Sequence, residues 1–180
     1  MDKTDLRRQL LQKRLQLSPN EWQRRSLQLA DQFKSWLLGR SFENFILYRS
    51  FRQEPDLSSL VASLGWDRCY YPKVRGKDLV FHRAPVYGEF LKNNWGLEEP
   101  PEDQSPALEA DENTLLVIPA LAFDRKFFRL GYGGGYFDRF LTRSSVATVG
   151  VCFDAFVLPQ LPIEPHDIPV QDLITESGFS

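Results

Sequence analysis

The sequence predicts an α/β fold with a mostly parallel central sheet flanked by helices. Short apolar runs of strand length alternate with segments of helical spacing along the 180 residues. Strands of a parallel sheet are covered on both faces, and the runs TLLVIPALAF (114–123) and VATVGVCF (146–153) are apolar enough for that position. The only long connection expected to lack regular structure is the proline-rich, acidic stretch at 95–113. We expect one domain over residues 1–180, since this length suits a single core.

An amphipathic helix is predicted over residues 2–17. Its leucines gather on one side, while Lys3, Arg7 and Arg14 recur along another side. From the spacing alone, Lys3 and Arg7 are interpreted as a solvated basic face.

A second helix is predicted to begin at Ser18, a natural N-cap whose capping box is completed by Glu21, and to end at Gly39. Its buried side is predicted to be Trp22, Leu29, Phe33 and Trp36. The later elements are a strand at 44–50, a helix at 55–65, strands at 67–74 and 77–83 with a turn at 75–77, and a helix at 136–143 between the strands at 114–123 and 146–153. This alternation indicates a Rossmann-like arrangement.

Composition argues against several classes of partner. The formal net charge of -2 gives no electrostatic reason to expect a nucleic-acid partner. The first residues lack the apolar run of a signal peptide, and no stretch approaches the ~18 apolar residues needed to span a bilayer. We therefore expect a cytoplasmic protein with no membrane partner. Cys69 and Cys152 lie in apolar, strand-like stretches and are expected to be buried free thiols.

The segment RLGYGGGYFDRF (129–140) places four glycines between Arg129 and Asp138. A glycine-rich turn between a strand and a helix presents free N–H groups that can bind phosphate, although a purely structural turn would have the same composition. The spacing is neither that of a dinucleotide loop nor that of a Walker loop. Asp138 could hold Mg2+ or could simply be a favourable charge near a helix start, and Arg129 could pair with phosphate or with a surface carboxylate.

Several ordered motifs in this chain resemble one family. They are KTDLR (3–7), YRSFRQEPD (48–56), YYPKV (70–74), WGLEEP (95–100), VIPALAFDRKFFRLGYGGGYFDRFL (117–141) and LPIEPHDIPVQDLITE (161–176). Together they resemble the 5-formyltetrahydrofolate cyclo-ligases, also called methenyltetrahydrofolate synthetases, almost from end to end. The chain differs from the family pattern at Phe127, where the family usually has Gly, and at Phe137, where it usually has Tyr.

The resemblance implies an ATP- and Mg2+-dependent ligase that converts 5-formyltetrahydrofolate to 5,10-methenyltetrahydrofolate and releases ADP and phosphate. ATP would phosphorylate the formyl oxygen, and N10 would then attack the activated carbon. The alternative is a non-catalytic nucleotide- or folate-binding module on the same scaffold, for which Phe127 and Phe137 are the only hints. The implied partners are a reduced folate and a nucleotide, and we expect a monomer.

The resemblance also implies roles for individual residues. Asp138, Tyr136 and Arg129 are implied in catalysis. Contacts to ATP are implied for Lys3, Arg7, Arg129, Leu130, Gly131, Tyr132, Gly133, Gly134, Gly135, Tyr136 and Phe137. Contacts to folate are implied for Arg49, Glu54, Trp95, Tyr132 and Tyr136, and magnesium ligation for Asp138 and Asp167.

Alternatives remain for some of these residues. Glu54 could be an acid in the first turn of the following helix, and Trp95 could be a plain core residue. His166 is taken as a neighbour of the metal site rather than a ligand. Lys73 and Arg49 could each reach either folate or nucleotide.

Overall fold

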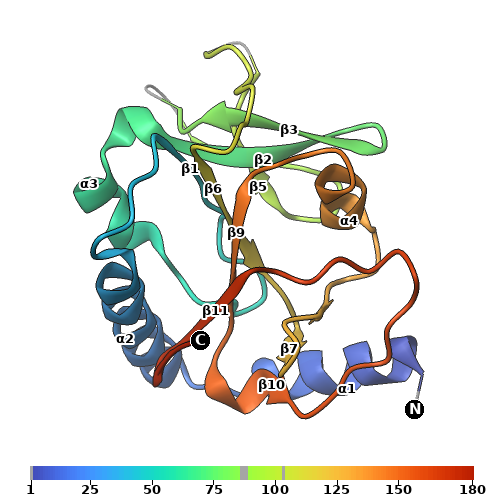
Figure 1. Cartoon of the computed structure of the whole chain (residues 1–180). Coiled ribbons are helices and arrows are strands. Elements are labelled where there is room, and N and C mark those ends of the chain that lie inside the picture. The colour runs from blue at the N-terminus through green and yellow to red at the C-terminus, as the bar shows by residue number, and fades with distance from the viewer. Residues whose placement is uncertain (1, 86–88, 103) are drawn as a thin grey trace.

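A seven-stranded sheet organises the molecule (Figure 1), which is described here from a computed structural model covering residues 2–85, 89–102 and 104–180. The strand order is β12-β11-β9-β6-β1-β2-β3. The strands are β1 Asn44–Ile46, β2 Cys69–Arg75, β3 Asp78–Arg83, β6 Thr114–Pro119, β9 Ala147–Val151, β11 Asp172–Thr175 and β12 Gly178–Phe179. The five inner strands are parallel, and β3 and β12 add one antiparallel strand at each edge. The predicted α/β fold is confirmed.

Two smaller sheets accompany the main one. They are β10-β7-β8, with β7 Ala122–Asp124, β8 Arg129–Leu130 and β10 Val157–Leu158, and the pair β4 Leu91–Lys92 with β5 Glu98–Glu99. The helices are α1 Lys3–Arg14, α2 Pro19–Leu37, α3 Val61–Leu64 and α4 Tyr136–Leu141, with 3-10 turns at Ser58–Leu60, Trp66–Arg68 and Asp154–Phe156. Helix α2 packs on β11 and β12, and α4 packs on β3. Helix α1 runs along the end of the molecule where β7 and β10 lie (Figure 1).

The helix starts follow the capping rules. Ser18 accepts the Glu21 N–H at the start of α2, as predicted, but the Glu21 carboxylate bonds to Arg25 instead of completing the capping box. At the start of α1, Asp2 accepts the Asp5 N–H. Three of the four residues predicted to be buried on α2 are buried, whereas Trp22 is half-buried because its indole N–H reaches the Glu54 carbonyl at the edge of a pocket. Both cysteines are buried free thiols, as predicted.

Several predicted boundaries are wrong. The strand expected at 44–50 stops at Ile46, because the side chains of Tyr48 and Ser50 bond to the carbonyls of Pro55 and Glu54 and turn the chain. The helix expected at 55–65 is only a 3-10 turn followed by α3. The run at 114–123 divides into β6 and β7, since Leu121 pairs with Leu130 of the small sheet. The stretch at 95–113 contains β5, and the strand β11 was not anticipated from the pattern.

The turn around Phe127 forms without the usual glycine. Phe127 has a φ of 66°, in the left-handed region. The buried Asp124 carboxylate accepts the N–H groups of Lys126 and Phe128 through one oxygen and that of Leu161 through the other. These bonds hold the turn despite the cost of a side chain at positive φ.

The sheet has a topological switch point between β1 and β6. After β1 the chain adds β2 on one side of it, and then β6, β9 and β11 on the other side. In open α/β sheets, ligands bind outside the carboxyl ends of the strands at such a point. Residues 47–56 follow β1 and include the loop of Glu54. Residues 120–135 follow β6 and include the glycine loop.

Among the described residues, no helix has the length and apolar character to cross a membrane.

Candidate active site

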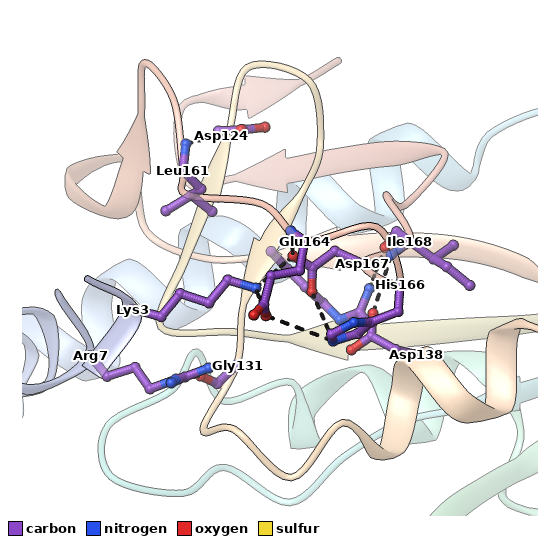
Figure 2. A network of polar contacts seen from close by, with 11 residues as sticks. Lys3, Arg7, Asp124, Gly131, Asp138, Leu161, Glu164, His166, Asp167 and Ile168 are labelled. Carbon is purple, nitrogen blue, oxygen red and sulfur yellow. Dashed lines mark hydrogen bonds and ion pairs between the residues drawn. The ribbon is translucent and has the colours of Figure 1, made fainter. Parts of the chain in front are cut away.

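The basic residues of α1 face the glycine loop. Arg7 Nε donates to the Gly131 carbonyl at 2.9 Å, and Lys3 Nζ lies 2.7 Å from a Glu164 oxygen and 2.6 Å from an Asp167 oxygen (Figure 2). The interpretation of Lys3 and Arg7 as a solvated basic face is therefore wrong, because both side chains are bound to other segments of the chain. Helix α1 thus brings two cations to the loop and to the segment at 164–167.

The glycine loop needs glycine for two different reasons. Gly133 has a φ of +103° and Gly135 a φ of +63°, which L residues with side chains rarely adopt. A Cβ added at Gly134 would lie 2.7 Å from the ring of Tyr136, so space is limiting there. At Gly131 no atom lies within 4 Å of an added Cβ, and its φ is not in the positive range.

Arg129 and Asp138 form an ion pair beside the loop. Arg129 Nη2 lies 2.6 Å from Asp138 Oδ1, and the Arg129 side chain is 5% exposed. Arg129 Nη1 donates to the Ile168 carbonyl, and the Ile168 N–H donates back to Asp138. Burial lowers the pKa of the Arg129 guanidinium, and the Asp138 carboxylate opposes that shift. Ile168 follows Asp167 directly, so this network holds both predicted metal carboxylates in one region (Figure 2).

Three neighbouring side chains offer atoms that could hold a metal ion. One ligand atom each from Glu164, His166 and Asp167 lies within 4.8 Å of the others. Burial raises the pKa of the Asp167 carboxyl, but the hydrogen bonds from Lys3 and from the Glu164 N–H outweigh it, so the pKa lies below its ordinary value. Asp138 is not a member of this group. His166, expected to be only a neighbour, places its Nε2 3.8 Å from Glu164 and 3.9 Å from Asp167.

Glu54 is buried beneath the loop that follows β1. It is 3% exposed and accepts the Phe51 N–H at 3.1 Å. Burial raises its pKa to about 7, although Arg14, the Phe51 N–H and Tyr132 oppose the shift. Glu54 does not lie in the first turn of a helix, since helical structure begins only at Ser58.

The aromatic residues of the proposed folate site lie near these loops. The ring of Tyr132 lies 5.8 Å from that of Phe51, and the ring of Trp95 lies 6.5 Å from that of Tyr136. Trp95 is 59% exposed, so the alternative of a core residue is wrong. The side chains of Leu130 and Phe137 pack on the core, which leaves mainly their backbone for a ligand.

A pocket of about 530 Å³ opens beside the Glu54 loop. It is lined by Pro19, Trp22, Arg49, Ser50, Phe51, Arg52, Gln53, Asp56, Lys92, Gly96 and Glu98. Arg49 Nε lies 2.8 Å from Glu98. Lys73 lies instead beside Glu99, with 3.7 Å between its Nζ and the nearer carboxylate oxygen. Of the two cations whose roles were open, Arg49 is the one that lines this pocket.

Arg14 is a buried residue that was not among the predicted site residues. It was expected on the polar side of the first helix, but it is 1% exposed and shares the buried face of α1 with Leu6 and Leu10. Its spacing of four residues from Leu10 and eight from Leu6 is the signal that could have indicated burial.

Comparison with known proteins identifies the family. Residues 1–176 match the 5-formyltetrahydrofolate cyclo-ligase family. The chain belongs to this family. The 5-formyltetrahydrofolate cyclo-ligase of Escherichia coli strain K12 is 29% identical over 175 residues, which cover 92% of this chain and 96% of that protein. The Mycolicibacterium smegmatis cyclo-ligase is 36% identical over 90 residues, and this alignment covers 49% of the chain and 46% of the relative's length.

A solved structure supports the same assignment. The NMR structure of Aquifex aeolicus 5,10-methenyltetrahydrofolate synthetase aligns with a TM-score of 0.84 and 31% identity, over 99% of this chain and 92% of that one. The resemblance inferred from the motifs is therefore confirmed, and so is the expectation of an enzyme, since the relatives are named as ligases and synthetases. The roles of individual residues stay predictions.

Proposed function

We propose that this protein is an ATP- and Mg2+-dependent 5-formyltetrahydrofolate cyclo-ligase. In the proposed reaction, 5-formyltetrahydrofolate becomes 5,10-methenyltetrahydrofolate while ATP becomes ADP and phosphate. The observation that supports nucleotide binding is that two cations of α1 contact this region: Lys3 bonds to Asp167, and Arg7 bonds to the glycine loop. Cations, backbone N–H groups and carboxylates at one place are what phosphoryl transfer requires.

ATP would lie along the glycine loop. The loop offers backbone N–H groups, and Lys3, Arg7 and the nearby Arg129 offer positive charge for the phosphates. These cations are now paired with protein acceptors, so phosphate would replace or share those partners.

Mg2+ fits the carboxylates of this region. Asp167 and Asp138 would hold it, since carboxylate oxygens are the ligands that Mg2+ prefers, and Glu164 adds a further oxygen beside Asp167. A bound Mg2+ would supply charge neutralisation at the phosphate oxygens.

The folate would lie on the other side of the glycine loop. Glu54 would accept the N–H donors of the pterin, and the rings of Tyr132, Tyr136 and Trp95 would flank its aromatic parts. Arg49 lines the adjoining pocket, where it would meet an acidic part of the substrate. Tyr132 belongs to the glycine loop and contacts the Glu54 loop, so the two substrates would meet at this residue.

The proposed chemistry has two steps. The formyl oxygen attacks the terminal phosphorus of ATP, which gives a phosphorylated formyl intermediate and ADP. N10 of the folate then attacks the activated carbon and loses its proton, and the C–O bond breaks, so that phosphate leaves together with that proton as the ring closes. The residues of the chain bind and orient both substrates and balance the phosphate charge, so no side chain has to act as a nucleophile.

A direct assay tests this function. The purified protein is mixed with 5-formyltetrahydrofolate, ATP and Mg2+, and the near-ultraviolet absorbance of the methenyl product is followed. We expect absorbance to grow only when all three are present, with ADP formed in equal amount. A non-catalytic binding module would gain thermal stability from the ligands without any growth of absorbance, and that result would overturn the proposal.

Replacing Lys3 and Arg7 by Gln tests the ATP contacts. We expect the KM for ATP to rise roughly tenfold if ~1.4 kcal/mol of phosphate contact is lost. The matched control is Arg8→Gln, because Arg8 lies on the same helix but its side chain is 68% exposed, and the ion pair it forms within the described residues is with Asp5. Steady-state kinetics at varied ATP distinguish the two variants, and an unchanged KM in the double variant would remove both residues from the ATP site.

We also infer one domain, a monomer and a cytoplasmic location. A single core of buried residues connects α1, α2 and the strands of both larger sheets, which supports one domain over residues 1–180. Light scattering would test the monomer against the chain mass of 20.9 kDa.

A further inference from the structure

Arg14 is the most completely buried charged residue in the described part of the chain, and it makes three hydrogen bonds to different segments. Its Nε donates to the Arg52 carbonyl and its Nη1 to the Ala120 carbonyl, each at 2.9 Å. Its Nη2 donates to the Tyr132 hydroxyl and lies 3.9 Å from a Glu54 oxygen. A planar guanidinium presents five N–H donors in a fixed geometry, so one side chain can hold several acceptors at once.

These partners belong to both proposed substrate sites. Arg52 and Glu54 lie in the loop after β1, Ala120 follows directly after β6, and Tyr132 lies in the glycine loop. Arg14 therefore spans the carboxyl ends of the two strands at the switch point, where a ligand is expected. No other described arginine or lysine is seen to bond to both loops.

The loop that Arg14 holds is strained. Arg52 has a φ of 50° and Gln53 a φ of 58°, two consecutive residues with side chains in the left-handed region. Such backbone persists only where surrounding contacts hold it. Arg14 holds the Arg52 carbonyl, Gln53 Nε2 donates to the Leu17 carbonyl, and the Phe51 N–H donates to Glu54.

The Tyr132 ring completes the connection between the loops. It packs edge-on against Phe51, and the guanidinium carbons of Arg14 and Arg52 lie 5.8 and 5.9 Å from its centre. A shift of the glycine loop on binding phosphate would therefore move a side chain that touches the Glu54 loop.

We propose that Arg14 is a positioning residue that holds the Glu54 loop and the glycine loop in one arrangement, so that nucleotide and folate bind cooperatively. This inference rests on the proposed function, because it takes the two loops as the folate and nucleotide sites. Arg14 touches neither substrate in this scheme and acts through Tyr132, Arg52 and Glu54. By thermodynamic linkage, each ligand must raise the affinity for the other by the same factor.

Calorimetric titration of the full chain tests the coupling. The Kd of 5-formyltetrahydrofolate is measured with and without a saturating non-hydrolysable ATP analogue and Mg2+, and the reverse titration checks reciprocity. For the wild type we expect the analogue to tighten folate binding by at least about fivefold. Arg14→Lys keeps the charge but loses the planar set of donors, and Tyr132→Phe keeps the ring but loses the hydroxyl. Both variants should lose the coupling, with a ratio of Kd values near one.

A structural control separates positioning from stability. Leu10→Ala removes a buried side chain from the same face of α1 without touching the network, so it should lower the melting temperature but keep the wild-type coupling. If Arg14→Lys does not fold, the coupling measured for Tyr132→Phe tests the proposal by itself. Coupling that survives in the variants, that is lost equally in Leu10→Ala, or that is missing in the wild type would overturn the inference. Failure of the wild type to form the methenyl product would instead overturn the proposed function.

Discussion

Burial moves the pKa of Glu54 away from the ordinary value of a glutamate carboxyl group. Its carboxyl group has a pKa near 4.5 in water, and enclosure beneath the loop after β1 raises that pKa to about 7. The neutral form can donate a hydrogen bond and the charged form can only accept one, so both forms are accessible near neutral pH. A carboxylate that contacts a pterin would then respond to pH within the working range of an enzyme.

Glu54→Gln is expected to change how stability depends on pH. Because the pKa in the folded state lies above that in the unfolded state, the folded protein holds more protons between pH 4.5 and 7, and its stability falls as the pH rises through this range. Gln cannot ionise, so the variant should exceed the wild type by up to about 3 kcal/mol above pH 7 and match it below pH 4.5. Urea unfolding across this range measures the difference.

Glu109→Gln is the matched control for that measurement, because Glu109 is exposed. We expect no pH-dependent gain from it. Equal pH profiles for Glu54→Gln and the wild type would show that Glu54 is ionised at little cost in the folded protein.

Asp138 balances the charge of a buried arginine and is also a proposed magnesium ligand. Asp138→Asn leaves the Arg129 guanidinium, whose side chain is 5% exposed, without its counter-ion. We expect turnover to be lost and the free energy of unfolding to fall by up to about 3 kcal/mol. Asp5→Asn, at the exposed pair with Arg8, should cost at most about 1 kcal/mol. Turnover measured at limiting Mg2+ decides the catalytic part, and an unchanged rate would remove Asp138 from the site.

At the scale of elements, the glycine loop and helix α1 form one unit. The loop contacts the helix through the bond from Arg7 to the Gly131 carbonyl, and the Arg7 guanidinium also lies beside Gly133. An added Cβ at Gly133 would lie 3.4 Å from Arg7 Cζ, which is tight but not prohibitive. The main constraint at Gly133 is therefore its φ of +103°.

Gly133→Ala and Gly131→Ala separate backbone strain from ligand exclusion. Gly133→Ala should lower the stability of the ligand-free protein by ~1–2 kcal/mol because of its φ. Gly131→Ala has open space and no positive φ, so the ligand-free protein should keep its melting temperature. If phosphate lies against the loop, Gly131→Ala should still lose the thermal protection given by ATP and Mg2+. Full protection in Gly131→Ala would argue against close approach of phosphate at that residue.

At the scale of the whole molecule, the main sheet and the small sheet β10-β7-β8 pack closely around one glycine. Gly150 lies in β9, and an added Cβ there would lie 2.5 Å from the ring of Phe123 in β7 and 3.1 Å from Val170. The lack of a side chain lets the Phe123 ring lie directly on the strand. Through this contact the central sheet packs against β7, which precedes β8 and the glycine loop.

Gly150→Ala is expected to destabilise the whole fold. Overpacking of a filled core costs ~1–3 kcal/mol, and the fully buried Phe123 has no solvent-exposed space into which it could move. Thermal unfolding measures the loss. Adding Phe123→Leu to the same variant should recover part of it, because the shorter side chain makes room for the methyl group. A Gly150→Ala protein as stable as the wild type would mean that the two sheets can move apart at little cost.

The sequence by itself determined the fold class, the family and most of the residues proposed for the site. Apolar runs and helical spacing are local properties, and the glycine segment with its flanking Arg129 and Asp138 is continuous in the chain, so both can be found without coordinates. Lys3 and Arg7 were also found, but only through the resemblance, since their spacing on the helix equally fits a solvated face.

Only the tertiary structure decided where the chain leaves the main sheet and which partners the buried charges meet. The run 114–123 is apolar throughout, and its division at Pro119 depends on a partner, Leu130, that lies later in the chain. Arg14 has an ordinary helical position, and its burial depends on acceptors at Arg52, Ala120 and Tyr132, which are 38, 106 and 118 residues away. Hydrogen-bond partners brought together by folding have no local pattern, so the raised pKa of Glu54 and the acceptors of Arg14 could not be predicted from spacing.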